Sequence, residues 1–105
     1  MAVRGTRAGN RLVVVHAARP GDRVGMPARV GLAVSRAVGN SVVRNRAKRV
    51  LRARLAHLVP ELPSGTDIVV RAQPQLVGAD GADLSEALVT ALQRAVSGAA
   101  RRAKA

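Results

Sequence analysis

The chain has 105 residues, of which 48% are hydrophobic, and 18 Lys and Arg against 6 Asp and Glu give a formal net charge of +12. This length and apolar content predict one small folded domain. The absence of Cys, Phe, Tyr and Trp excludes disulfides, thiolate metal sites and aromatic base-stacking platforms. No apolar stretch approaches the roughly 20 residues that span a bilayer, and we expect a cytoplasmic protein.

The first half of the chain predicts two strands joined by a loop. Residues 1–10 show no periodic apolar pattern, whereas residues 11–18 (RLVVVHAA) are β-branched and of strand length. Two Pro and two Gly predict a loop over residues 19–27. Residues 28–35 (ARVGLAVS) are nearly all apolar, which is typical of a strand covered on both faces.

The strongest helical pattern covers residues 42–59, between the Gly39-Asn40-Ser41 capping segment and Pro60. At 100° per residue, the apolar side chains fall within one arc of about 140°, and they are Val43, Ala47, Val50, Leu51, Leu55 and Leu58. The opposite side carries Asn45, Arg46, Arg49 and Arg52. This pattern predicts an amphipathic helix with one polar, cationic side.

The second half predicts a strand over residues 68–72 and a closing helix from Asp83 to Gly98. Asp83 with Glu86 three residues later resembles a capping box. We expect the basic tail, residues 99–105, to fray.

This order of elements predicts an α+β fold, with helices packed on a small sheet and a β-α-β crossover through the first helix. It also predicts a single domain over residues 1–98.

Catalytic motifs are absent from the sequence. His16 and His57 are 41 residues apart, so they do not have the clustered spacing of metal ligands. The carboxylates lie mostly in predicted turns and at a helix start, where capping and solubility explain them. No glycine-rich phosphate loop or nucleophile elbow occurs. We therefore expect neither catalytic nor metal-binding residues.

Charge is concentrated in the first part of the chain. Residues 1–60 carry 13 Arg or Lys and one acid, Asp22, whereas residues 61–105 carry equal numbers of each sign. Residues 35–54 contain no acid and seven cations, namely Arg36, Arg44, Arg46, Lys48, Arg49, Arg52 and Arg54. A solvated helix face is the ordinary explanation of such a segment, but like charges repel along a helix. Because a polyanion would remove this repulsion, the segment predicts phosphate binding, with nucleic acid as the natural partner. Arg44 and Arg54 lie at the edge of the apolar arc and are not expected to be free surface residues.

Three consecutive motifs resemble the signature of the bacterial ribonuclease P protein component: residues 29–35 (RVGLAVS), 38–40 (VGN) and 41–49 (SVVRNRAKR). The following PSGTDIVVR segment, residues 63–71, fits the same family in order. The resemblance covers roughly residues 4–96.

The resemblance implies the small subunit of a ribonucleoprotein endonuclease that removes the 5′ leader of precursor tRNA. In this family the large RNA is the catalyst and holds Mg²⁺. The implied partners are therefore that RNA and precursor tRNA. The resemblance also implies that the protein is a monomer and does not bind a membrane. Carried over by position, the candidate RNA contacts are Arg36, Asn40, Arg44, Asn45, Arg46, Lys48, Arg49 and Arg52.

The family's fold is similar to domain 2 of ribosomal protein S5. It implies a left-handed crossover in place of the usual right-handed one.

The sequence departs from the family at its start. Family members begin with a basic amphipathic helix that contains Phe, and of that region only residues 4–7 (RGTR) remain here. We therefore expect the domain to lack this helix and the aromatic side chains of the family's leader cleft.

Two alternatives stay open at this point. A ribosomal or assembly protein that binds structured RNA would not affect leader removal, and a nucleoid-type DNA-binding protein would prefer duplex DNA.

Overall fold

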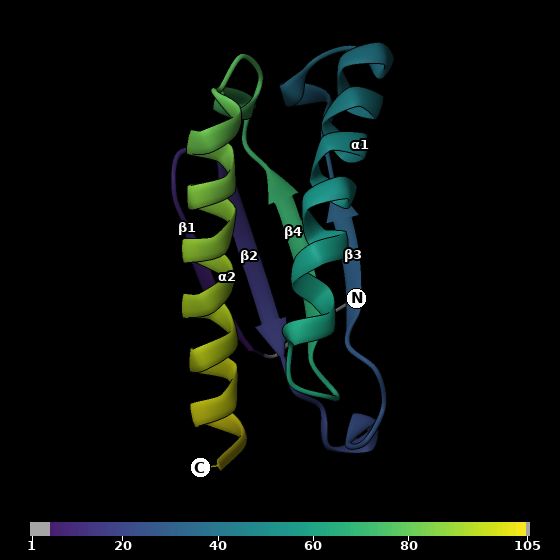
Figure 1. The fold of residues 1–105 in the computed structure, drawn as a ribbon, viewed down its shortest axis with the longest axis vertical. Coiled ribbons are helices and arrows are strands. Elements are labelled where there is room, and N and C mark those ends of the chain that lie inside the picture. Colours follow the sequence, from purple (N-terminus) through teal and green to yellow (C-terminus); the bar gives the residue numbers. More distant parts are fainter. Residues whose placement is uncertain (1–4, 105) are drawn as a thin grey trace.

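The structure is a computed structural model that describes residues 5–104 (Figure 1). Within these residues it has four strands and two helices, joined in part by short 3-10 turns. In chain order they are β1 (Thr6–Gly9), β2 (Val13–Ala18), β3 (Arg29–Ala33), α1 (Ser41–Leu58), β4 (Asp67–Ala72) and α2 (Gly81–Lys104). All five predicted elements are present, and β1 is an addition to them.

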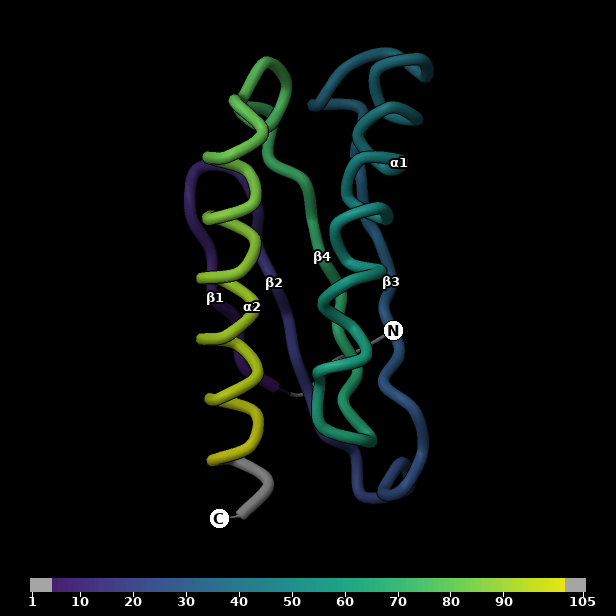
Figure 2. The backbone as a smooth tube through the Cα atoms, in the orientation of Figure 1, coloured from purple at the N-terminus to yellow at the C-terminus, as the bar shows by residue number. Residues whose placement is uncertain are grey.

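The four strands form one mixed sheet in the order β1-β2-β4-β3. β2 pairs antiparallel with β1 and with β4, whereas β3 is parallel to β4. Both helices lie side by side on one face of this sheet (Figure 1, Figure 2). In Figure 1 both parallel strands point upward and α1 lies in front of them, with β4 to the left of β3. The crossover is therefore left-handed, as the family resemblance implies, and the predicted α+β fold is confirmed.

The core lies between the sheet and the two helices. Alternate residues of the two central strands face it, namely Val13, Val15, Ala17, Ile68, Val70 and Ala72. The helices contribute small and branched apolar side chains, chiefly Ala47, Leu51, Leu55, Leu88, Leu92 and Ala95. No helix of the described chain covers the opposite face of the sheet (Figure 1), so the remaining strand side chains are left on an open face.

Edge strand β1 forms where the sequence shows no pattern. Thr6 pairs with Ala17 of β2, and its hydroxyl donates a hydrogen bond to the carbonyl oxygen of Ala95 in α2. The close approach of α2 depends on Gly98, where a Cβ would lie 2.6 Å from Cγ2 of Thr6. Contacts with distant residues, rather than local propensity, therefore define this strand.

Strand β3 corrects a second expectation. Its apolar sequence predicts a strand covered on both faces, but β3 is an edge strand in which Arg29 and Gly31 are exposed. Only alternate residues, Val30 and Leu32, pack against the core. The sequence cannot distinguish a strand covered on both faces from one covered on a single face, because Gly31 and Ala33 on the uncovered face are also apolar.

Both ends of α2 differ from the prediction. Asp80 rather than Asp83 caps the helix: its Oδ1 accepts a hydrogen bond from the backbone N–H of Ala82 at 3.4 Å, and its carbonyl accepts one from Leu84 at 2.9 Å. At the other end the helix continues past Gly98 to Lys104, because Gly98 serves the contact with β1 rather than helix termination. The residues expected to form a frayed tail are therefore helical up to residue 104, and Ala105 lies outside the described residues.

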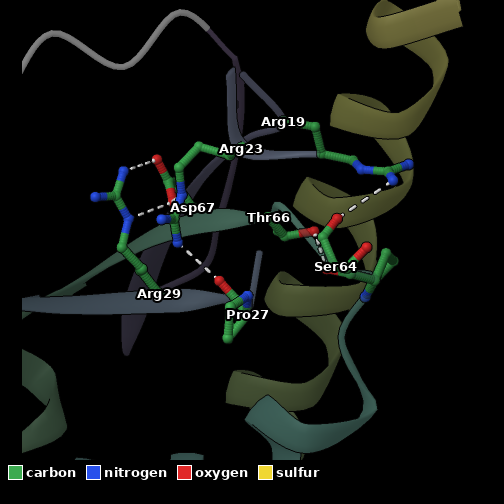
Figure 3. A network of polar contacts seen from close by, with 8 residues as sticks. Arg19, Arg23, Pro27, Arg29, Ser64, Thr66 and Asp67 are labelled. Carbon is green, nitrogen blue, oxygen red and sulfur yellow. Dashed lines mark hydrogen bonds and ion pairs between the residues drawn. The ribbon is translucent and has the colours of Figure 1, made fainter. Parts of the chain in front are cut away.

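A buried carboxylate clamps the first residues of the two parallel strands, Arg29 and Asp67, which are register partners (Figure 3). Nε and Nη2 of Arg29 donate to the two oxygens of Asp67 at 2.9 and 2.6 Å. Nε of Arg23 lies 3.6 Å from the same carboxylate, whose side chain is 6% exposed. Asp67, which the sequence places in a solubilising turn, is thus a structural ion-pair partner.

The Asp67 pair makes stability depend on pH. Hydrogen bonding from Arg29 lowers the pKa of Asp67 below its ordinary value of 3.8, against the opposing effect of burial. Its contribution is therefore complete above that value and is lost as the pH falls below it through the lower folded pKa. We expect Asp67→Asn to reduce the free energy of unfolding at pH 7 by about 1–3 kcal/mol and to flatten its decline below pH 4.

Denaturant unfolding as a function of pH measures both effects. Asp83→Asn is the matched control, because Asp83 is exposed in the first turn of α2. Equal losses in the two variants would contradict the structural role of Asp67.

Candidate nucleic-acid interface

The basic helix α1 begins at a turn built for it. Oδ1 of Asn40 accepts a hydrogen bond from the backbone N–H of Val43 at 3.0 Å, which caps the helix. Gly39 before it has a φ of 155°, and a Cβ there would lie 2.9 Å from Cγ1 of Val43. The VGN motif is therefore explained by helix initiation. Asn40, a candidate RNA contact, already has this structural role through its oxygen.

The candidate side chains of α1 do not share one side of the helix. Ala47, Leu51 and Leu55 face the core, and each further residue is rotated by 100°. Lys48 and Arg52 point toward β3, where they line a groove of about 450 Å³ with Val30 and Leu32, among others.

Arg46 points the other way, into a second groove beside the start of α2. Asn45 and Arg49 are exposed on the crest between the two grooves. The helix is thus a cationic ridge with a groove on each side, rather than a helix with one flat polar side. Arg36 is exposed in the short 3-10 turn Arg36–Val38 that leads into the same ridge.

Arg44 is the unusual member of the candidate set. Its direction on α1 lies close to that of Leu51, and the side chain is half-buried. Its Nε is buried and has no hydrogen-bond partner among residues 5–104. A buried donor without a partner costs free energy, and the fold offers no reason to keep it.

Arg54 has a different role from the other cations of α1. Its Nε donates to Oγ of Ser85 at 3.0 Å, and its Nη2 donates to the carbonyl oxygen of Gly81 at 3.3 Å. These bonds tie α1 to the first turn of α2. The expectation that Arg54 is not a free surface residue is confirmed.

The ridge carries uncompensated charge. The ion pairs found among the described residues join Arg23 and Arg29 to Asp67, and none includes a cation of α1. The helix itself contains no acid. Its cations therefore repel one another at short range, and a polyanion is the partner that would reverse this cost.

The open face of the sheet holds cations that sequence reasoning missed. Arg7 on β1 lies opposite His16 on β2, and Arg71 on β4 lies opposite Val14 on β2. Burial lowers the pKa of His16, and the positive charges of Arg71 and Arg7 lower it further. These residues are far apart in the chain, so only the strand register brings them together.

Gly31 lies on the same open face. Its φ is not positive, and within residues 5–104 a Cβ added there would find no atom nearer than 3.9 Å. Glycine weakens a strand, yet neither backbone conformation nor packing requires it here. A glycine at such a position leaves room for a ligand or another backbone to approach the sheet closely.

Among residues 5–104, no three His, Cys, Asp or Glu side chains come together as a group that could hold a metal ion. None of the helices in this part of the chain is long and apolar enough to cross a membrane.

Comparisons with known proteins agree on one family. The Ribonuclease P family model matches residues 2–96. The chain is 46% identical over 105 residues to the ribonuclease P protein component of Streptomyces avermitilis, covering 93% of this chain and 85% of that one. It is 56% identical over 81 residues to that of Beutenbergia cavernae, covering 77% and 66%.

Solved structures show the same likeness. The RNase P protein of Staphylococcus aureus matches with a TM-score of 0.75 at 26% identity, covering 88% of this chain and 82% of that one. The protein from Thermotoga maritima matches with a TM-score of 0.72 at 29% identity, covering 87% and 84%.

The unpartnered Nε of Arg44 yields a prediction about stability. Arg44→Met keeps the aliphatic stem and removes the buried donor, so we expect the free energy of unfolding to stay within about 0.5 kcal/mol of the original or to rise. Arg54→Met is the control, since it loses two hydrogen bonds between helices and should cost about 1 kcal/mol or more. Chemical denaturation measures both. A larger loss for Arg44→Met than for Arg54→Met would show that the fold uses Arg44.

Proposed function

Because the chain belongs to the bacterial ribonuclease P protein family, we propose that its α1 ridge binds the RNA subunit of the enzyme that removes the 5′ leader of precursor tRNA. The family match favours this function over the ribosomal or assembly alternative and over a nucleoid role. The ridge comprises the candidate residues that surround the exposed part of α1 and its entry turn, namely Arg36, Asn40, Arg44, Asn45, Arg46, Lys48, Arg49 and Arg52.

The observation that carries this proposal is the unpaired charge of the ridge. Its cations have no carboxylate partner among the described residues, and the buried Nε of Arg44 has no acceptor. Phosphate groups would compensate the charge of the ridge. Each phosphate contact releases condensed counterions from the RNA, so binding of this kind becomes weaker as salt rises.

Ribonuclease P is an endoribonuclease, and we place its catalytic chemistry and its Mg²⁺ in the RNA subunit. The acidic side chains of this chain serve other purposes: Asp67 pairs with Arg29, and Asp80 caps α2. The protein supplies positive charge and a defined surface to the folded RNA. We infer that it acts as a monomer in a cytoplasmic ribonucleoprotein.

We assign contact with the precursor tRNA to the open face of the sheet. Arg7 and Arg71 provide cations there, and the small residues Gly31 and Ala33 leave room beside Val69 for a nucleotide strand to approach the sheet. His16 adds a planar ring between the two arginines. Because the chain has no Phe, Tyr or Trp, bases on this face would stack on the imidazole of His16 and on the guanidinium groups of Arg7 and Arg71.

The RNA-binding proposal predicts a steep salt dependence. If about five ridge cations meet phosphates, the slope of log K against log[salt] for binding to the RNA subunit should be roughly −3.5 to −4.5. Arg46→Ala and Arg49→Ala should each weaken binding and reduce the slope by about one contact. Both residues are exposed, so stability should change by no more than about 0.5 kcal/mol.

Leu51→Ala is the control for this experiment, because Leu51 is fully buried and its truncation should cost about 2–5 kcal/mol of stability. Filter binding at several salt concentrations, beside thermal unfolding, separates the two effects. A wild-type slope near zero, or unfolding of Arg46→Ala and Arg49→Ala as severe as that of Leu51→Ala, would contradict the proposal.

The assignment of precursor tRNA to the open face predicts that Gly31→Ala maintains or improves stability but weakens the use of precursor tRNA. Gly31→Ala should leave the fold as stable or make it more stable by up to about 1 kcal/mol, since it removes a glycine from a strand. It should raise the KM of the reconstituted holoenzyme for precursor tRNA, with affinity for the RNA subunit unchanged.

Gly21→Ala is the matched control for Gly31→Ala, because a Cβ at Gly21 meets no atom of the described residues within 4 Å and this residue lies in the loop before β3. An unchanged KM in Gly31→Ala would remove the open face from precursor recognition.

A further inference from the structure

An apolar groove lies beside the cationic ridge. It is enclosed by α1, by residues 76–79 and by the first turn of α2, and its volume is about 440 Å³. Its walls are aliphatic and consist mainly of Val43, Ala47, Val50, Leu76 and Leu84. This volume is within the range of sites that hold small organic groups, roughly 300–1,000 Å³.

The lips of the groove expose valine side chains to solvent. Val42 on α1 is 71% exposed, and Val77 on the facing loop is 48% exposed. The other large hydrophobic side chains exposed to this degree in the described chain are Val24 and Met26, in the loop before β3. Apolar side chains gathered at a concave site indicate an interaction surface rather than scattered exposure.

Charge around the groove favours an anionic occupant. Arg46 lines one side, and Arg54 closes the other with its guanidinium held between Ser85 and Gly81. No carboxylate of the described residues lines the groove, although Asp80 lies next to it as the cap of α2. An apolar floor with a cationic rim matches a group that is flat and apolar at one end and negatively charged at the other.

We infer that this groove receives an unstacked nucleobase of the RNA subunit, with Arg46 contacting the phosphate of the same nucleotide. The inference rests on the proposed function, because the groove continues the ridge that the RNA would cover. Proteins recognise RNA largely through bases that have left the helical stack and lie against a side-chain surface. This chain has no Phe, Tyr or Trp on which a base could stack. The facing side chains of Val42 and Val77 provide an apolar surface instead. An acidic protein segment is the competing occupant.

The test compares one double valine variant, one charge variant and one control variant. Val42→Ser combined with Val77→Ser should lower affinity for the RNA subunit roughly four- to fifteenfold, as expected if the base buries one or two of the four methyl groups that this variant lacks. The slope of log K against log[salt] should stay unchanged, because no phosphate contact is lost. Arg46→Ala should reduce that slope by about one contact. Val24→Ser is the matched control and should leave affinity unchanged.

Base-specific chemical probing of the RNA subunit identifies the occupant. With the wild-type protein, at least one unpaired base should be protected, and the double valine variant should restore its reactivity while the rest of the footprint remains. Unchanged affinity and footprint in the double variant would overturn the nucleobase inference and favour the acidic protein segment. The proposed function would survive that result if wild-type binding kept its steep salt dependence, and would fail if it did not.

Discussion

The pairing of β3 with β4 is the constraint on which the rest of the structure depends, and the Arg29–Asp67 ion pair sets its register. A slip of one residue would turn every β3 side chain to the other face. Val30 and Leu32 would then leave the core, and Gly31 would enter it. Since α1 connects the two strands, the same register also decides where the cationic ridge lies and which face of the sheet stays open.

Charge separation is the second organising feature. The described acids that make contacts serve structure: Asp67 holds two strands together and Asp80 caps α2. The cations of α1 have no carboxylate partner among the described residues. Its buried apolar side holds the helix through Ala47, Leu51 and Leu55, and the hydrogen bonds of Arg54 tie it to α2. A fold of this kind keeps positive charge available for a partner, and a partner that binds only the folded chain would in turn stabilise it.

Much of this architecture could be predicted from the sequence, because α1 has a helical periodicity, β2 is a β-branched segment of strand length, and the RVGLAVS–VGN–SVVRNRAKR motifs are specific. Three features could not. Strand β1 depends on contacts of Thr6 with Ala95 and Gly98, at the other end of the chain. The role of Asp67 requires its register with Arg29. The open-face group of Arg7, His16 and Arg71 comes from three strands, and no local pattern marks it. For the ridge, the sequence could identify the cations but not their division between two grooves.

The single sheet has a consequence for how two RNA molecules could be held together. Helix α1, which carries the ridge, lies on one side of the sheet (Figure 1), whereas the strand register places Arg7 and Arg71 on the other. Two phosphodiester chains repel one another when they approach. A domain that carries positive charge on both sides lowers that repulsion and keeps the two chains at a fixed separation. With the RNA subunit on the ridge and the precursor on the open face, the distance between them would be set by the thickness of one helix and one sheet.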